Sequence, residues 1–341
     1  MRLLVTGGAG FIGSNFVRGV YRWKPGWTVT VLDKLTYAGR LENLDDVKTE
    51  EGFRFLKGDI CDPFSVAEAM EGCDAVVNFA AETHVDRSIE DAASFVRTDV
   101  EGVRVLMEEF RRKDRALFLQ VSTDEVYGSV EHGSSKEIHK LDPRSPYAAS
   151  KAGGELLAMS YWTTYGVPVV VTRASNNYGP FQYPEKLIPL FITNAMDGEP
   201  LPLYGDGMNV RDWLYVDDHC KALLRILEKS GPGRIYNVGA GQLFTNREVT
   251  SAILEATGAP RNLVRYVDDR PGHDRRYCLD VTLMEEELGW KAETPFREGL
   301  AMTVEWYRRN RNWWEVIKSG EFREYYKTMY SGRLERSGGY R

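Results

Sequence analysis

A glycine-rich turn near the start of the chain limits the folds that this sequence can adopt. Residues 6–13 read Thr-Gly-Gly-Ala-Gly-Phe-Ile-Gly, follow an apolar run at Leu3–Val5 and precede a helical pattern. Because Gly7, Gly10 and Gly13 have no side chains, the turn can be tight and can bring a phosphate close to the backbone. The helix that follows would offer unpaired N–H groups to that phosphate. The turn therefore predicts a strand, a phosphate-binding loop and a helix in succession.

Short apolar runs alternate with helical patterns through the first half of the chain. We expect strands at Leu3–Val5, Val29–Leu32, Phe53–Leu56, Ala75–Phe79, Leu117–Val121 and Val167–Thr172. Strands that alternate with helices in this way form a mostly parallel sheet with helices on both faces. The predicted fold is therefore an α/β, Rossmann-type doubly wound parallel sheet with a smaller, interleaved C-terminal lobe.

The composition of the sequence changes after about residue 175, where Pro and Gly become frequent. We expect a dinucleotide-binding domain over residues 1–175, a substrate lobe over 176–330 and a tail over 331–341. Strand-like segments at Trp213–Val216 and Arg234–Val238 indicate that the chain returns to the sheet near residues 210–240. The aromatic residues between Trp306 and Tyr330 recur at helical spacing and predict a buried helix or an interface.

Composition excludes several classes of protein. The chain has 341 residues and a formal net charge of −6, with Lys and Arg scattered among Asp and Glu, so we expect no nucleic-acid partner. The four cysteines form no C-x-x-C pair and the five histidines no H-x-x-x-H pair, so we expect neither disulfides nor a metal. We also expect no signal peptide, no membrane span and a cytoplasmic location.

The second predicted strand ends in Asp33, about 20 residues after the glycine turn. A carboxylate in this position can accept hydrogen bonds from an adenosine ribose, and it would repel a 2′-phosphate. The sequence therefore favours NAD over NADP as the cofactor. Gly58-Asp59-Ile60 follows the third strand, where an adenine could lie, and the small residues near Ala80 would admit the cofactor after the fourth strand.

Tyr147 and Lys151 are four residues apart, and Pro146 is suited to the start of a helix. On a helix the two side chains lie on one face. A phenol has a pKa near 10, but a neighbouring ammonium and a positively charged nicotinamide would favour the phenolate. We expect Tyr147 to take a proton from a sugar hydroxyl while a hydride leaves the same carbon.

Thr123, Asp124 and Glu125 follow the fifth predicted strand, at the edge where catalytic groups gather in open α/β sheets. Thr123 can hydrogen-bond the reacting hydroxyl. Two neighbouring carboxyl groups can differ in pKa, so that one stays protonated and the other is ionised. The pair therefore predicts an acid and a base in one site.

Together these motifs resemble the extended short-chain dehydrogenase/reductase superfamily. The Asp-Glu pair after Thr123 is similar to that of the nucleoside-diphosphate-glucose 4,6-dehydratases, especially those acting on dTDP-glucose, whereas the related sugar epimerases lack it. Further segments extend the match up to about residue 310: 81–88, 175–180, 184–189, 211–213 and 270–274.

The resemblance implies a hydro-lyase that uses NAD to convert dTDP-glucose into dTDP-4-keto-6-deoxyglucose. Tyr147 would remove the proton of the 4-hydroxyl while hydride passes from C4 to NAD, and Lys151 would lower the pKa of Tyr147. Glu125 would then act as the base at C5, and Asp124 would protonate the departing C6 hydroxyl. Return of the hydride to C6 would regenerate NAD, and the product would enter deoxysugar biosynthesis.

The predicted site residues fall into three overlapping groups. The catalytic residues are Thr123, Asp124, Glu125, Tyr147 and Lys151. The expected cofactor-binding residues are Gly7, Gly10, Phe11, Ile12, Gly13, Asp33, Lys34, Thr36, Asp59, Ile60, Phe79, Ala80, Ala81, Thr98, Val121, Tyr147, Lys151 and Asn177. The expected substrate-binding residues are Thr83, His84, Thr123, Asn176, Lys186, Leu187, Pro202, Tyr204, Arg211, Asn246, Arg270 and His273. In this scheme Tyr204 stacks on the base, and Arg211 and Arg270 bind the pyrophosphate.

The sequence departs from the family pattern at a few places, the first of them in the fourth helix. Thr98 is followed by Asp99 where relatives often have Asn, and Ala174 stands where relatives often have Cys. The loop at 242–244 is also more apolar than the family pattern.

Several alternatives remain open at this point. A UDP-, GDP- or CDP-sugar dehydratase and a nucleotide-sugar 4-epimerase would use the same fold, and a non-catalytic NAD-binding regulator would need none of the catalytic residues. The family is usually a homodimer joined through helices that include the one carrying Tyr147. Small residues on this helix would allow close helix packing: Ala148, Ala149, Ala152, Gly153 and Gly154.

Overall fold

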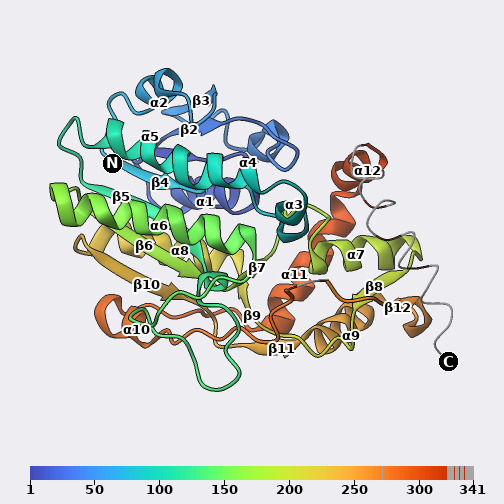
Figure 1. The fold of residues 1–341 in the computed structure, drawn as a ribbon. Helices are drawn as coiled ribbons and strands as arrows, with labels where there is room; N and C mark the ends of the chain where they lie inside the picture. The colour runs from blue at the N-terminus through green and yellow to red at the C-terminus, as the bar shows by residue number, and fades with distance from the viewer. Residues whose placement is uncertain (271, 321–325, 327–329, 331–333, 335–341) are drawn as a thin grey trace.

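The computed structural model describes residues 1–270, 272–320, 326, 330 and 334. Its centre is a seven-stranded, fully parallel sheet with the strand order β10-β6-β5-β4-β1-β2-β3 (Figure 1). The strands are β1 (Arg2–Thr6), β2 (Thr28–Asp33), β3 (Phe53–Lys57), β4 (Ala75–Asn78), β5 (Leu117–Thr123), β6 (Val169–Ala174) and β10 (Arg234–Val238). The predicted doubly wound sheet is confirmed, and each strand predicted for it overlaps an observed one.

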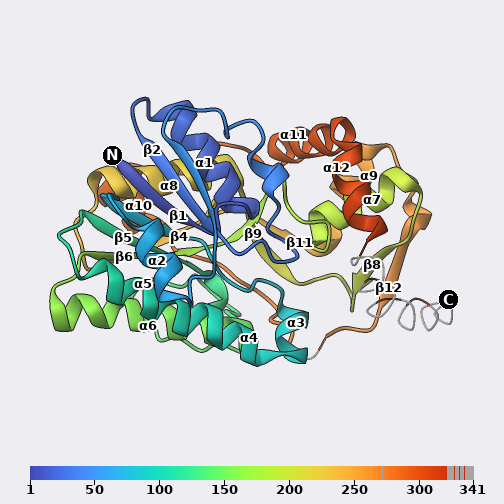
Figure 2. The same cartoon turned by 90° about the horizontal axis from the view of Figure 1, so that it is seen from above.

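Helices cover both faces of this sheet, and each face has its own apolar core (Figure 2). One layer contains α1 (Phe11–Trp23), α8 (Val216–Lys229) and α10 (Thr282–Leu288). The other contains α2 (Pro63–Ala69), α5 (Val103–Phe110) and α6 (Pro146–Tyr165). Because both faces are covered, β1, β4, β5 and β6 consist almost entirely of buried residues.

The strand order reverses between β1 and β4, because β1 pairs with β2 on one side and with β4 on the other. Ligands of open parallel sheets bind outside the carboxyl ends of the strands at such a reversal. The glycine turn follows β1 at this edge. Next to it run α3 (Val85–Glu90), α4 (Ala92–Val96) and a π-helical turn over Arg97–Gly102.

The smaller lobe lies beside the carboxyl edge of the sheet (Figure 1). It contains a three-stranded sheet of β11 (Leu243–Thr245), β9 (Val210–Tyr215) and β7 (Asn176–Tyr178), and a pair of β12 (Val264–Val267) and β8 (Leu201–Tyr204). Its helices are α7 (Leu187–Asp197), α9 (Asn246–Thr257), α11 (Phe296–Arg309) and α12 (Arg311–Ser319). The strand-like segment at Trp213–Val216 therefore belongs to a separate sheet, whereas β10 pairs with β6 in the main one.

The aromatic residues near the C-terminus fill the core of the smaller lobe. Tyr307 on α11 and Trp314 on α12 are fully buried, and the indole of Trp314 donates to the Tyr307 carbonyl. The predicted tail over 331–341 lies outside the described residues, apart from Leu334. Within the part of the chain that the structure describes, no helix is long and apolar enough to cross a membrane.

Candidate active site

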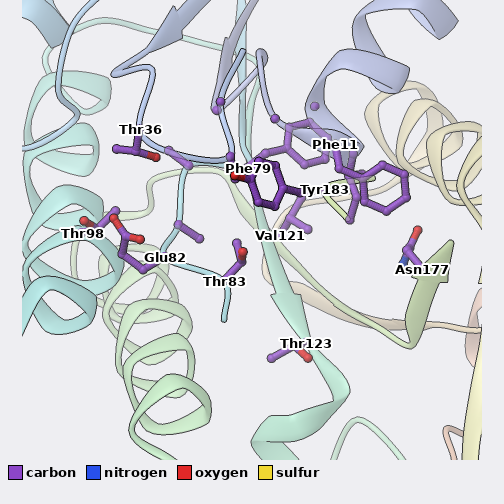
Figure 3. A pocket seen from close by; sticks show the side chains of 18 of the residues that line it. Phe11, Thr36, Phe79, Glu82, Thr83, Thr98, Val121, Thr123, Asn177 and Tyr183 are labelled. Atoms are coloured by element: carbon purple, nitrogen blue, oxygen red, sulfur yellow. The ribbon is translucent and has the colours of Figure 1, made fainter. Parts of the chain in front are cut away.

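A deep cavity lies where the glycine turn, the ends of β2, β4, β5 and β6, and the first turns of α6 meet. Figure 3 shows side chains from both lobes around it, with Phe11 and Tyr183 on one side and Thr98 and Glu82 on another. Every residue that the sequence indicates for catalysis or for the cofactor lines this cavity. The sheet edge has therefore brought segments that are far apart in the sequence together.

The glycine turn adopts a shape that larger residues would not allow. Gly7 has a φ of +68°, and a Cβ atom built on it would lie 2.6 Å from the backbone nitrogen of Ala80. A Cβ atom on Gly13 would collide with the carbonyl oxygen of Gly7. Gly10 is the N-cap of α1 and provides no side-chain cap. The first N–H groups of α1 therefore lack a side-chain acceptor, and they lie beside the cavity.

Asp33 supports the glycine turn from the end of β2. Its carboxylate accepts hydrogen bonds from the backbone N–H groups of Ala9, at 2.9 Å, and Leu35, at 2.8 Å. Burial raises the pKa of Asp33, and these two hydrogen bonds oppose the shift. The neighbouring Lys34 pairs with Asp59 at 2.8 Å. Asp33 thus holds the loop in shape in addition to facing the cavity.

These residues fit a dinucleotide. The start of α1 offers donors to a pyrophosphate, and the glycines leave room for its close approach. The carboxylate of Asp33 carries a charge that opposes an additional phosphate on the ribose. No cluster of His, Cys, Asp or Glu suited to a metal ion occurs among the residues that the structure describes.

Tyr147 and Lys151 lie on the first turns of α6. Ser145 caps this helix by accepting from the Ala148 N–H at 3.1 Å, so Pro146 stands at the predicted helix start. Lys151 Nζ donates to the carbonyl oxygen of Val121 at 2.9 Å, which fixes the ammonium against β5. Burial lowers the pKa of Lys151, whereas Asp99 raises it.

The pKa of Tyr147 shifts in the direction opposite to the one expected from Lys151. Burial raises it well above its ordinary value, and the charges of Glu125 and Asp99 add to this effect. Thr123, as a hydrogen-bond partner, acts in the opposite direction and lowers the pKa. The protein by itself therefore favours the phenol form, because the hydroxyl is buried and acidic groups act on it.

Asp124 and Glu125 stand side by side in different surroundings. Asp124 is buried, and burial together with the charge of Glu125 raises its pKa well above the ordinary value. Burial also raises the pKa of Glu125, but Arg270, Arg211 and Lys186 lower it in turn. The hydroxyl of Thr123 lies 3.2 Å from Asp124 Oδ1 and accepts from the Glu125 N–H. Both pKa values are therefore raised, but that of Asp124 more strongly, so Asp124 is the better suited of the two to be the neutral acid.

Comparison with known proteins places the chain in a family. Residues 4–303 match the family model of GDP-mannose 4,6 dehydratase. A dTDP-glucose 4,6-dehydratase from Streptomyces niveus is 53% identical over 323 residues, which cover 94% of this chain and 96% of that protein. The chain belongs to the dTDP-glucose 4,6-dehydratase family.

Solved structures agree with this assignment. DesIV, a dTDP-glucose 4,6-dehydratase from Streptomyces venezuelae crystallised with NAD, superposes with a TM-score of 0.91 at 52% identity, covering 93% of this chain and all of that one. A UDP-glucose 4-epimerase from Thermus thermophilus in complex with NAD reaches 0.84 at 34% identity, covering 91% of this chain and 100% of that chain. Dehydratases and epimerases therefore share the fold, and the identity is higher with the dehydratase.

Only some of the residues expected to bind the substrate line the cavity. Thr83, Thr123, Asn176 and Lys186 line the cavity. The others do not: His84, Leu187, Pro202, Tyr204, Arg211, Asn246, Arg270 and His273. Some of these still lie close to it, since the charges of Arg211 and Arg270 act on Glu125.

A second cluster in the smaller lobe contains several of the remaining residues. The rings of Tyr204 and His273 meet edge to face with their centroids 6.2 Å apart, and His273 Nδ1 lies 2.6 Å from Asp269. Arg211 donates to the Asp274 carbonyl at 2.9 Å. The side-chain oxygen of Asn246 is buried and has no hydrogen-bond partner among the described residues. Arg211 of this cluster and the neighbouring Arg270 act electrostatically on Glu125.

Other residues line the cavity without having been predicted from the sequence. They include Tyr37, Glu82, Ser122, Gln182, Tyr183, Glu185 and His219. Ser122 and Glu185 each stand next to a predicted residue, and Tyr37 follows Thr36. Their position beside predicted residues is therefore the one feature of the sequence that could have indicated them. His219 lies inside α8, and its Nδ1 donates to Asn177 Oδ1 at 2.9 Å, a contact that no local pattern indicates.

Proposed function

We propose that this chain catalyses the NAD-dependent dehydration of dTDP-glucose to dTDP-4-keto-6-deoxyglucose. The proposal is supported by dTDP-glucose 4,6-dehydratases whose sequences are 52% to 53% identical to this chain, and the structure of one of them was solved with NAD bound. The observation that carries it is the presence of two acids of unlike surroundings, Asp124 and Glu125, in one cavity with Tyr147 and Lys151.

The first step is oxidation at C4 of the glucose. Bound NAD supplies a hydride acceptor, and its positively charged nicotinamide favours the phenolate of Tyr147, against the shift that the protein imposes. Tyr147 takes the proton of the 4-hydroxyl, and Thr123 holds that hydroxyl by a hydrogen bond. In this scheme Lys151, which donates to the Val121 carbonyl at 2.9 Å, is the cation that stabilises the phenolate.

The second step is elimination of water across C5 and C6. A ketone at C4 acidifies the C5 hydrogen, and Glu125 removes it, since burial raises its pKa less than that of Asp124 and nearby cations oppose the rise. Asp124 gives its proton to the C6 hydroxyl, which leaves as water, because burial keeps this acid protonated. C6 then receives the hydride that left C4, and C5 regains a proton, so no net oxidation results.

The nucleotide would bind on the side of the smaller lobe. Arg211 and Arg270 are suited to the pyrophosphate, since a guanidinium can bind two phosphate oxygens at once. Tyr204 offers an aromatic face to the base, and Asn246 an unpartnered oxygen. In this scheme residues 1–175 bind the cofactor and 176–330 bind the nucleotide sugar.

The reaction can be tested by mass spectrometry of dTDP-glucose incubated with the purified protein, without added reductant. We expect a product lighter by one water and no net formation of NADH. Tyr147→Phe should give no product. Unchanged dTDP-glucose together with turnover of UDP-, GDP- or CDP-glucose would refute the assigned nucleotide, and no turnover of any of them would refute the catalytic proposal.

An epimerase is the second candidate, because epimerases of 34% identity share the fold. Asp124 and Glu125 inside the cavity argue against it, since epimerisation needs no elimination. A product of unchanged mass with inverted C4 would favour the epimerase. A purely regulatory NAD-binding protein would leave the four ionisable catalytic residues without a use.

We further propose that the chain acts as a cytoplasmic homodimer. The described cysteines are all free thiols, as suits a reducing compartment. Of the small residues on α6, Ala148, Ala152 and Gly154 are buried inside the chain, which leaves Ala149 and Gly153 for an outer surface. Leu156 on the same helix and Val96 on α4 are 59% and 54% exposed. Light scattering at micromolar concentration should give twice the monomer mass, and a monomer would refute the dimer.

A further inference from the structure

A short segment of the smaller lobe runs along one wall of the cavity. We call residues 180–186, between β7 and α7, the strap. Gln182, Tyr183, Glu185 and Lys186 of the strap line the cavity, and Figure 3 shows Tyr183 on the same side as Phe11 of the glycine turn. The strap therefore borders the space assigned to the cofactor.

The first part of the strap is fixed to both lobes. Asn15 on α1 donates to the carbonyl oxygen of Pro180 at 2.9 Å, and the guanidinium of Arg18 lies 3.7 Å above the ring of Phe181. On the other side the Phe181 ring packs against Trp306, with centroids 4.6 Å apart. This end of the strap is thus held in place by α1 and α11.

The second part of the strap meets the loop that follows β2. Tyr37 donates a hydrogen bond to Glu185 Oε1 at 3.0 Å. Arg87 Nε on α3 lies 3.5 Å from Glu185 Oε2, and the Arg87 guanidinium lies 3.9 Å above the Tyr37 ring. We call Tyr37, Arg87 and Glu185 the latch. Its members come from three segments that are far apart in the sequence.

The latch joins a buried carboxylate to donors and cations, so breaking it is costly. The Glu185 side chain is only 1% exposed, so its carboxylate depends on neighbouring cations and donors. Arg87 and Lys186 supply positive charge, and Lys186 also donates to the Thr83 carbonyl at 2.6 Å. Burial raises the pKa of Tyr37 well above its ordinary value, so its hydroxyl remains a donor. Breaking the latch would leave a buried carboxylate without its partners.

The position of the latch connects it to the cofactor. The loop that carries Tyr37 begins at Asp33 and includes Thr36, both of which line the cavity. The latch therefore ties the ribose side of the predicted NAD site to the strap. A reaction that returns its hydride restores NAD in place, so the cofactor need not leave between turnovers.

We propose that the latch of Tyr37, Arg87 and Glu185 retains NAD in the cavity, and that it must open before the cofactor can leave. The proposal rests on the proposed function for the identity of the cofactor. It assigns to cofactor retention Tyr37 and Glu185, which were not among the predicted site residues, and Arg87, which does not line the cavity.

The test measures the release rate of NAD from the holoenzyme. Protein loaded with radiolabelled NAD is chased with excess unlabelled NAD, and the retained label is followed with time. We expect Tyr37→Phe and Arg87→Met to speed release by about ten-fold or more, the change expected when a hydrogen bond or ion pair to a buried charge is lost. Arg87→Met is decisive, because it keeps the aliphatic stem and alters no residue that lines the cavity.

A matched control exists elsewhere in the chain. Tyr236 donates to Glu287 at 2.8 Å, and Arg234 pairs with the same carboxylate at 2.7 Å, outside the cavity. Tyr236→Phe should leave the release rate unchanged, and thermal unfolding should show that all variants are folded. Release from Arg87→Met at the wild-type rate would overturn the proposal, even if Tyr37→Phe is faster. Because this measurement needs no sugar substrate, its failure is distinct from failure of the dehydratase assay.

Discussion

The glycine turn and the cation cluster near Glu125 approach the reaction site from opposite lobes and recognise ligands by different means. The turn presents backbone: glycines and the free N–H groups at the start of α1. The cluster presents side chains, among them Arg211, Arg270 and Lys186, which lie in three separate segments. Backbone recognition is encoded by a few consecutive residues, whereas the cluster exists only after the smaller lobe has folded.

The same difference bears on the side chains proposed for catalysis, because groups in the two lobes shift their pKa values. On the cofactor side Tyr147 faces acidic groups, and its pKa is raised. On the substrate side Glu125 faces cations, which lower its pKa against the effect of burial. The two bases of the proposed reaction are therefore tuned by different lobes.

The strongest test of this division is the conversion of Glu125 to an amide. Glu125→Gln keeps the shape but removes the base, so we expect dehydration to slow by roughly 10²- to 10⁴-fold. Oxidation at C4 depends on Tyr147 and should persist, visible as a transient absorbance of reduced nicotinamide. Glu68→Gln, on the exposed surface of α2, is the control. Loss of the transient as well would show that the two lobes do not act separately.

A smaller effect is expected from the glycine turn. Gly13→Ala places a Cβ atom against the Gly7 carbonyl, which must distort the loop. We expect NAD affinity, measured by equilibrium binding, to fall roughly 10- to 100-fold, as for the loss of a charge-assisted hydrogen bond. Gly231→Ala meets no atom within 4 Å and should leave binding unchanged. Unchanged NAD affinity in Gly13→Ala would mean that the cofactor does not depend on the backbone shape of the glycine turn.

Asp99 allows a pH test on the cofactor side. Its buried carboxyl accepts from Ser150 at 2.6 Å, and burial raises its pKa from 3.8 to about 6. A raised folded-state pKa stabilises the fold at low pH, and this contribution is lost as pH rises from about 4 to about 6. Relative to the wild type, Asp99→Asn should therefore gain about 2 kcal/mol of unfolding free energy between pH 4.5 and pH 7.

Chemical denaturation of both proteins at the two pH values measures this gain. Asp114→Asn, at an exposed turn, should show no such difference. A constant difference between Asp99→Asn and the wild type at both pH values would mean that Asp99 does not titrate in this range.

The smallest effect is expected in the cation cluster. Arg270→Lys keeps the charge but loses the planar pair of donors, so we expect KM for dTDP-glucose to rise about ten-fold with little change in kcat. Arg265→Lys, exposed on β12, serves as its control. An unchanged KM would mean that Arg270 does not bind the substrate, and the smaller lobe would then have no demonstrated part in substrate recognition.

The part of the site that could be predicted is the part made of short segments at strand ends. Phe11, Thr36 and Val121 line the cavity because each stands a few residues from the end of a recognisable strand. Tyr204 and His273 do not line it, although the resemblance indicated them, because their place depends on how β8 and the loop near residue 273 pack in the smaller lobe.

The sequence alone determined the parallel sheet, the phosphate-binding turn and the residue types proposed for catalysis. Each of these depends on periodicity or on neighbours a few residues apart, which the chain encodes locally. Only the tertiary structure decided the direction of the pKa shift at Tyr147, the unlike surroundings of Asp124 and Glu125, and the latch formed by Tyr37, Arg87 and Glu185. These properties depend on burial and on contacts between distant segments, because charges interact through space rather than along the chain.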